Sequence, residues 1–323
     1  MSVVLRRRVG LMLLLMAMVV GALVFPFPME GRLWGEIFNL AHAPVFCVTL
    51  LLLVGLPDPS AVGLSSQFVT VVPITFRRAS TIAGALMTVG IVCEYLQRFA
   101  GRNPSIADLM ANTTGIVAGI LWIWFCTSTL SGNRIRQACL PLLLLLAISL
   151  PTLFQIEDCV QQIGTFPQIA SFERRFELDG WAPNHAEIRA TNAWSTEGEQ
   201  SLEVALLPAT YSGTMMLWFE RDWSSYRFLN LDFQNPGTAP LTIVVKLHDR
   251  EHRRRGFPDG DHFYQVAELH PESEATVRVR LDDVRVALTE RDMDLQQMAV
   301  IEIFSIDIQR RSTFRVDNIR LSR

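Results

Sequence analysis

Long apolar runs fill the first half of this chain and stop near residue 156. Each run is about as long as a helix that crosses a bilayer, and the five runs lie at about 9–25, 40–56, 79–97, 106–126 and 138–154. Beyond them the apolar residues alternate with polar ones, which is typical of half-buried strands. The sequence therefore predicts an α-helical transmembrane bundle of about five helices in residues 1–156, a linker at 157–167 and a second domain at 168–323.

The positions of the arginines predict how these helices are oriented in the membrane. Under the positive-inside rule, seven of them mark cytoplasmic loops, namely Arg6, Arg7, Arg8, Arg77, Arg78, Arg134 and Arg136. Within residues 57–80 the apolar run QFVTVVPITF is too short to span and contains Pro73, so we expect this segment to be re-entrant or interfacial. A cleaved signal peptide at 9–25 is the alternative, but the residues that follow lack a small-residue cleavage pattern. The prediction is a bacterial inner-membrane protein with a cytoplasmic N-terminus and an extracytoplasmic C-terminal domain.

The charge of the second half and the positions of the cysteines bear on nucleic-acid binding and on disulfide formation. Up to residue 155 the chain has ten arginines and five acidic residues, which leaves 19 basic and 27 acidic residues in the remainder. An acidic second half argues against a nucleic-acid partner. Only Cys159 of the five cysteines belongs to the soluble side, so no disulfide is expected within the second domain. Cys159 is a bystander, a site of lipidation or half of an intermolecular disulfide.

Polar residues interrupt the apolar sequence between Glu94 and Gly119. Glu94 and Gln97 share one helix face, and Asp108, Asn112 and two glycines at positions 115 and 119 share another. Ionisable groups at such depth are costly, so they indicate a functional site. The spacing Gly115-x-x-x-Gly119 would let a neighbouring helix approach closely.

The predicted topology places these residues on the same side of the membrane as His42 of the second helix. His42 lies at the outer end of that helix, although a capping or packing role for it is an equal alternative. Arginines 98 and 102 break the charge rule and are expected to pair with the acids or with an anionic ligand. The predicted outer-leaflet pocket consists of His42, Glu94, Gln97, Arg98, Arg102, Asp108 and Asn112.

This ordered set resembles the VanZ-like family of membrane proteins over roughly residues 5–155. The shared pattern is Glu-x-x-Gln-Arg followed by Asp-x-x-x-Asn-x-x-Gly across a helical hairpin, with a histidine in NLAHAPVF near the start of the second helix. Asn39 stands where the family often has a lysine. The resemblance implies a link to lowered susceptibility to a glycopeptide antibiotic, without an established reaction.

The second domain reads as strands separated by turns. Period-two alternation occurs in SLEVALL, RFLNLDFQN, LTIVVKLHD, ATVRVRL, AVIEIFSIDIQ and FRVDNIRL. Turn signals stand between them at Asp179-Gly180, Asn235-Pro236-Gly237, Asp259-Gly260 and Pro271-Glu272. The pattern predicts an all-β antiparallel jelly-roll sandwich.

The opening SFE, the GW at 180–181, EGEQSLEV, WSSYRFLNLDFQNPG and the closing VDNIRL resemble galactose-binding-like jelly rolls of carbohydrate-binding modules. The resemblance implies glycan binding. It also implies a possible structural calcium ion between the first and last strands, for which Glu173 and Asp317 are the candidate ligands.

Aromatic faces and planar polar groups bind sugars, and the second domain contains both. The candidates are Trp181, Trp194, Trp223, Tyr226, Tyr264, Asp249, Arg250 and His262. Large aromatic residues of a sandwich are more often core than ligand platforms. Trp194 and Tyr264 lie in polar segments and are the stronger candidates for a platform.

Two hypotheses follow for function. In the first, the sandwich binds an envelope glycan or lipid-linked saccharide near the membrane pocket, in polysaccharide assembly or antibiotic tolerance, with membrane lipid as the other partner. In the second, the protein is an enzyme whose Glu94 and Asp108 act as acid and base on a lipid-linked glycan or its phosphate, with His42 as a further catalytic candidate. No nucleophile motif is present, and no cofactor is implied beyond the calcium ion.

Overall fold

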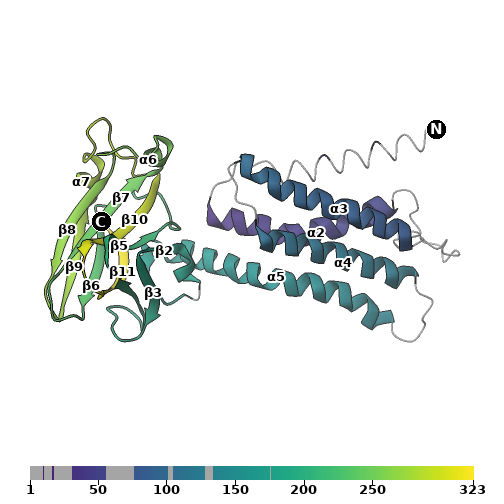
Figure 1. The fold of residues 1–323 in the computed structure, drawn as a ribbon, viewed down its shortest axis with the longest axis horizontal. Coiled ribbons are helices and arrows are strands. Elements are labelled where there is room, and N and C mark those ends of the chain that lie inside the picture. Colours follow the sequence, from purple (N-terminus) through teal and green to yellow (C-terminus); the bar gives the residue numbers. More distant parts are fainter. Residues whose placement is uncertain are drawn as a thin grey trace. The chain divides into compact units, whose positions relative to one another are not determined.

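A computed structural model of the chain describes residues 31–55, 76–100, 105–127, 134–174 and 176–323, together with Gly10 and Ala17. The chain divides into two compact units, Met1–Ile156 and Glu157–Arg323. The first unit is helical and the second consists mainly of strands (Figure 1). The predicted helix at 9–25, residues 57–75 of the predicted re-entrant segment, and Arg102 lie outside the described residues.

The described helices of the first unit are long and apolar. They are α2 (Arg32–Gly55), α3 (Phe76–Gln97), a 3-10 turn η2 (Arg98–Ala100), α4 (Ile106–Thr127) and α5 (Arg134–Thr165), which continues into the second unit. Four stretches within them have the length and composition to cross a membrane, at Arg32–Val54, Arg78–Gln97, Ile106–Cys126 and Cys139–Thr165. Helices α2, α3 and α4 share a core that includes Phe46, Leu86 and Ile116.

Two helix boundaries differ from the sequence prediction. Helix α2 begins at Arg32, whereas the apolar run predicted a start near residue 40. The extra turns are polar, and Asn39 there donates a hydrogen bond to Glu36 one turn earlier. The last helix is longer than the predicted 138–154, because α5 continues to Thr165, and most of the segment predicted as a linker at 157–167 is therefore helical. Residues 157–163 contain no glycine or proline, so a hydropathy drop there did not mark a helix end.

Helices α2 and α4 approach each other closely at two glycines. A Cβ atom added to Gly115 would lie 2.1 Å from the carbonyl oxygen of Ala43, and one added to Gly119 would lie 2.9 Å from the side chain of Leu50. Only glycine permits this separation, so the predicted role of the Gly115-x-x-x-Gly119 spacing is confirmed.

The second unit contains two antiparallel sheets. The first has the order β3-β4-β11-β6-β9, with β1 also paired to β11, and the second has the order β2-β5-β10-β7-β8. The strands of the first sheet are β1 (Gln168–Ala170), β3 (Ala186–Thr191), β4 (Ser201–Leu206), β6 (Phe228–Asn235), β9 (Ser273–Arg280) and β11 (Ser312–Ser322). Those of the second are β2 (Trp181–Asn184), β5 (Ala209–Met216), β7 (Leu241–Asp249), β8 (Phe263–Leu269) and β10 (Met298–Ile308).

One core joins the two sheets. It takes Leu231 and Phe314 from the first sheet, Val245 and Ile303 from the second, and Trp223 from the segment between β5 and β6. The six alternating runs of the sequence all form strands, which are β4, β6, β7, β9, β10 and β11. The predicted fold class, transmembrane helices followed by an antiparallel sandwich, is confirmed. The short helices η3 (Glu177–Gly180), α6 (Arg250–Arg254) and α7 (Leu281–Arg285) lie between strands.

Candidate functional site

Five polar residues of the first unit meet where α2, α3 and α4 pack together; we call them the helical cluster. Each is at most 8% exposed, and the set is His42, Glu94, Gln97, Asp108 and Asn112. The histidine comes from α2, the next two residues from the last turn of α3, and the last two from the first two turns of α4. The structure therefore brings together five of the seven residues predicted for the membrane pocket.

Hydrogen bonds orient the histidine of the helical cluster. His42 Nδ1 lies 2.9 Å from Asn112 Oδ1. An amide oxygen only accepts hydrogen bonds, so Nδ1 carries the hydrogen and the Nε2 of the neutral ring has a free lone pair. This Nε2 lies 3.9 Å from Asp108 Oδ2, which is too far for a direct hydrogen bond.

Neighbouring groups hold the two carboxylates in place. Gln97 Nε2 donates to Glu94 Oε1 at 3.2 Å, and the backbone N–H of Ser105 donates to Glu94 Oε2 at 3.1 Å. The Ser105 hydroxyl accepts from the backbone N–H of Asp108 at 3.3 Å, in the manner of a helix N-cap. One ligand atom each from His42, Glu94 and Asp108 lies within 4.8 Å of the others.

Of the two predicted arginines, the structure describes Arg98, and it does not join this set. Arg98 is exposed on η2, and its guanidinium lies 5.0 Å from the centre of the Tyr95 ring. Arg102 lies outside the described residues, so its pairing with the acids stays a prediction.

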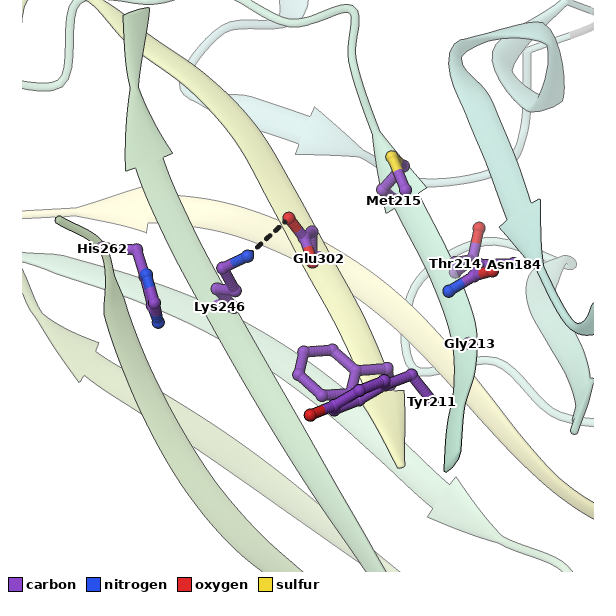
Figure 2. A pocket seen from close by; sticks show the side chains of 9 residues that line it. Asn184, Tyr211, Gly213, Thr214, Met215, Lys246, His262 and Glu302 are labelled. Atoms are coloured by element: carbon purple, nitrogen blue, oxygen red, sulfur yellow. Dashed lines mark hydrogen bonds and ion pairs between the residues drawn. The ribbon is translucent and has the colours of Figure 1, made fainter. Parts of the chain in front are cut away.

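A second candidate site is a hollow on the five-stranded sheet of the sandwich, shown in Figure 2; we call it the sheet pocket. Its volume is about 380 Å³, and its lining residues are Asn184, Tyr211, Gly213, Thr214, Met215, Lys246, His262, Glu302 and Phe304. These residues come from β2, β5, β7 and β10 and from the residue before β8.

One side of the sheet pocket is aromatic. Tyr211 is 56% exposed, and its ring packs edge-on against Phe304 with centres 5.9 Å apart. Gly213 is the partner of Phe304 in the antiparallel register. A Cβ atom on Gly213 would lie 2.2 Å from the Ile303 carbonyl oxygen, so the glycine allows β5 and β10 to pair beneath the rings.

The other side of the sheet pocket is charged. Lys246 and Glu302 are cross-strand partners whose Nζ and Oε1 atoms are 3.1 Å apart. His248 Nε2 lies 3.7 Å from the same carboxylate oxygen. Burial lowers the pKa of His248 and of His262 from the ordinary value of 6.5. Among the described residues, the buried Nδ1 of His262 has no hydrogen-bond partner.

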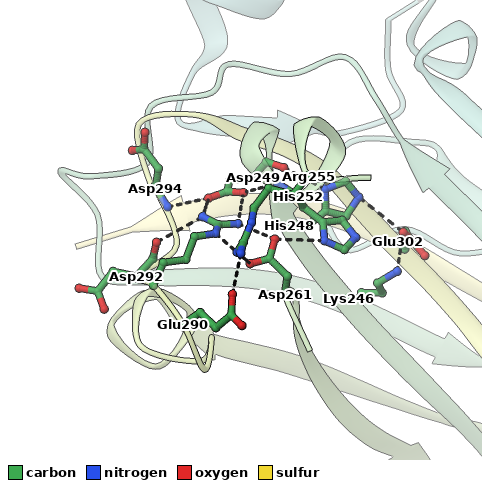
Figure 3. Close-up of polar contacts among 11 residues, drawn as sticks. Lys246, His248, Asp249, His252, Arg255, Asp261, Glu290, Asp292, Asp294 and Glu302 are labelled. Carbon is green, nitrogen blue, oxygen red and sulfur yellow. Dashed lines mark hydrogen bonds and ion pairs between the residues drawn. The ribbon is translucent and has the colours of Figure 1, made fainter. Parts of the chain in front are cut away.

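An ion network beside this pocket joins the end of β7 to the segments before β8 and β10 (Figure 3). Arg291 donates to both Asp249 and Asp261, and Asp249 also accepts from the backbone N–H groups of His252 and Asp294. Burial acts to raise the pKa of Asp249, but the bonds from Arg291 and the two N–H groups outweigh it and lower the pKa. The Asp249 carboxylate is fully buried and already bonded. Its predicted contact with glycan is not tested, but the structure gives it a supporting role.

The predicted tryptophans lie in different environments. Trp181 and Trp223 are buried in the core, and Trp223 Nε1 donates to the Glu220 carbonyl oxygen. Trp194 is half-buried, and its Nε1 donates to Glu274 at 2.7 Å. Of these three, only Trp194 offers an accessible ring.

The predicted tyrosines also differ. Tyr226 packs edge-on against Phe166 and is only partly buried. Tyr264, on β8, is 63% exposed and is the cross-strand partner of Lys246, so it lies beside the sheet pocket. The predicted roles of all these aromatic residues in glycan binding stay predictions.

Sequence reasoning did not select Tyr211 or Phe304. The signal was present in AVIEIFSIDIQ, where Ile301 and Ile303 point into the core and Glu302 between them faces outward. The phase of this alternation puts Phe304 on the outer face of β10.

The two candidate calcium ligands, Glu173 and Asp317, both accept hydrogen bonds from the loop at residues 196–200. Glu173 Oε1 accepts from the backbone N–H groups of Glu199 and Gln200. Asp317 accepts from the N–H groups of Thr196, Glu197 and Asn318. These N–H groups bond Glu173 Oε1 and both oxygens of Asp317, so the two carboxylates hold the loop in place. The calcium ion stays a prediction.

Comparison of the sequence with known families and curated proteins gives no assignment. No family model matches this sequence, and no curated protein matches it. The resemblance to the VanZ-like family therefore stays a prediction.

Three solved structures that resemble the chain over its C-terminal half each cover 48% of it. One is an exo-β-agarase, at 14% identity and a TM-score of 0.40, of which the match spans 24%. Another is the family 11 carbohydrate-binding module from Clostridium thermocellum in complex with a β-1,3-1,4-mixed-linked tetrasaccharide, at 17% identity, 94% coverage and a TM-score of 0.37. A third is a xylan-binding domain of carbohydrate-binding module family 22, at 14% identity, 92% coverage and a TM-score of 0.33. The fold assignment rests on the strand order and pairing of this chain itself.

Proposed function

We propose that this is a membrane-bound protein that binds a glycan in the sheet pocket. The observation that carries the proposal is an exposed aromatic ring, Tyr211, beside Phe304 and next to the Lys246–Glu302 ion pair on one sheet face. A sugar ring has apolar C–H faces that pack on aromatic rings and hydroxyl groups that bond to charged and amide groups. The sheet pocket supplies both kinds of contact within about 380 Å³, which is in the range of small-molecule sites.

Binding of the full-length protein in nanodiscs to an array of envelope glycans tests this proposal. Tyr211→Ala should lower the affinity for a bound glycan about tenfold, because the variant removes the stacking surface. Trp194→Ala is the control, since it removes a half-buried aromatic ring from a loop outside the sheet pocket. If Trp194→Ala abolishes binding and Tyr211→Ala does not, the site belongs on the loop and the sheet pocket is the wrong location.

We further propose that the ligand is a cell-envelope polysaccharide or a lipid-linked saccharide, and that the sandwich lies outside the cytoplasm. The arginine distribution and the four apolar helices in the described part of the chain support this location. Alkaline phosphatase fused after Arg323 should be active, and an inactive fusion with normal expression would contradict the topology. A role in polysaccharide assembly or antibiotic tolerance rests on the VanZ-like resemblance, and deletion of the gene followed by polymer and susceptibility measurements tests it.

A second candidate function is catalysis within the membrane. It is favoured by the convergence of His42, Glu94 and Asp108 within 4.8 Å in a buried site. Two carboxylates and an imidazole at this separation form the kind of set that general acid–base chemistry uses. In this case Glu94→Gln and Asp108→Asn should each abolish the cellular phenotype at unchanged expression, whereas persistence of the phenotype in both variants excludes this mechanism.

A further inference from the structure

The helical cluster has the donor set and spacing of a metal site. We propose that His42, Glu94 and Asp108 bind a divalent transition-metal ion, and that Zn²⁺ fits this donor set best. The proposal does not depend on glycan binding, because it concerns a different site in the other unit.

The first argument is distance. One imidazole nitrogen and two carboxylate oxygens lie within 4.8 Å of one another, and they come from three different helices. Zinc binds nitrogen and oxygen ligands at about 2.0–2.2 Å, so ligands of one tetrahedral ion stand roughly 3.4 Å apart. A movement of the side chains by about 1 Å would therefore complete the coordination.

The second argument is the orientation of the histidine. Its Nδ1–H donates to the Asn112 amide oxygen, so the lone pair of Nε2 is left on the side of Asp108. A histidine that binds a metal almost always donates its other ring N–H to an oxygen in this way, which fixes both the tautomer and the ring plane. Asn112 is thus the supporting residue that a His42 ligand needs.

The third argument is electrostatic. The His42, Glu94 and Asp108 side chains are almost completely removed from the surface of a unit whose helices are long enough to span a bilayer. Two carboxylates within 4.8 Å repel each other, and the repulsion grows as the local dielectric constant falls. A divalent cation between them removes this repulsion and also uses the histidine lone pair.

The donor set also selects among metals. Calcium and magnesium take oxygen ligands and do not use an imidazole nitrogen, whereas zinc accepts both. Three protein donors leave at least one position open on a tetrahedral ion, as in catalytic zinc sites.

Metal analysis of the full-length protein tests the proposal. The protein is purified in detergent without a histidine tag, stripped with a chelator, dialysed against Zn²⁺ or Mn²⁺ and measured by mass spectrometry. The wild type should hold about one Zn²⁺ ion per chain and bind Mn²⁺ more weakly. His42→Ala and Asp108→Asn should lose the bound metal, and Asn112→Ala should weaken Zn²⁺ binding by about 10–100-fold because it removes only the support of the histidine.

The matched control is His270→Ala, which removes an exposed histidine of the sandwich and should retain the full metal content. Co²⁺ in the wild-type protein provides a measurement that does not require the variants to fold. It should give the visible absorption of a four-coordinate site, and this absorption should disappear when excess Zn²⁺ is added. Wild-type protein that retains no metal and gives no such spectrum overturns the proposal, as does equal metal content in folded His42→Ala and wild-type protein.

Discussion

The helical cluster and the sheet pocket differ in which side chains are removed from water: polar ones in the first, whereas aromatic ones stay exposed in the second. In the helical cluster, polar side chains are taken out of water and bonded to one another among apolar helices, as the His42–Asn112 pair shows. In the sheet pocket, aromatic side chains that could have joined the core are left exposed, as Tyr211 shows. Both arrangements cost stability locally, since one desolvates polar groups and the other leaves apolar surface in water. Each unit therefore needs other contacts that hold its site together, and those contacts can be removed separately.

The largest expected effect concerns the ion network around Asp249. Arg291→Ala leaves the fully buried Asp249 carboxylate without its guanidinium partner, and removal of one partner of a buried ion pair costs about 3–5 kcal/mol. Thermal unfolding of the full-length protein should show a lower transition for the sandwich and an unchanged one for the helices. Arg285→Ala removes a guanidinium from an exposed pair with Asp282 and should change neither transition. Loss of the helical transition in Arg291→Ala would show that the two sites do not have independent support.

A smaller effect is expected in the helical unit. Gly115→Ala places a Cβ atom 2.1 Å from the Ala43 carbonyl oxygen, so α2 and α4 must move apart. Overpacking of this kind costs about 1–3 kcal/mol, which should lower the helical transition only. Gly84→Ala is the control, because a Cβ atom there meets nothing within 4 Å. The same displacement should separate His42 from Asp108, so the variant should also lose Zn²⁺; unchanged stability and metal content would show that the close helix contact is not needed.

The smallest effect concerns pH and the sandwich alone. Burial lowers the folded-state pKa of His248 and His262 below 6.5, so the unfolded chain binds more protons than the folded chain below that pH. Stability should therefore fall as the pH drops through 6.5 and level off below the folded-state pKa values. Glu177 and Asp317 act with the opposite sign, since burial raises the pKa of each.

A comparison with His262→Gln isolates the histidine contribution, because the two acids are the same in both proteins. The fall in transition temperature between pH 7.5 and 5.5 should be smaller in this variant than in the wild type. An identical fall in the two proteins would show that His262 does not contribute to the pH dependence.

The two sites also differ in how far the sequence predicts them. Polar residues stand out in an apolar run, so Glu94, Asp108 and Asn112 can be selected from their sequence context alone. The glycine spacing likewise predicted the close contact of two helices. What the sequence lacks is the rotation of each helix about its axis, which decides that His42 bonds to Asn112, 70 residues away, and that Arg98 faces outward. The metal donor set follows from those rotations.

Aromatic residues of a sandwich do not stand out from their sequence neighbours in this way. Trp223 and Tyr211 have similar polar neighbours in sequence, yet one fills the core and the other is exposed. Trp223 lies in the segment between β5 and β6, where no alternation marks it as buried. The neighbours of Tyr211 depend on the pairing of β5 with β10, which neither strand specifies by its own sequence. The alternating runs predicted the strands correctly, and only their register decided which side chains form the sheet pocket.

The cross-strand pair of Lys246 and Glu302 has a consequence for selectivity. Among the side chains that line the sheet pocket, these two carry the formal charges, and they cancel. This balanced pair gives no long-range attraction for uronate or sulfate groups. Under the glycan binding that we propose, neutral saccharides should therefore be distinguished by the positions of their hydroxyls, and their affinity should change little with ionic strength.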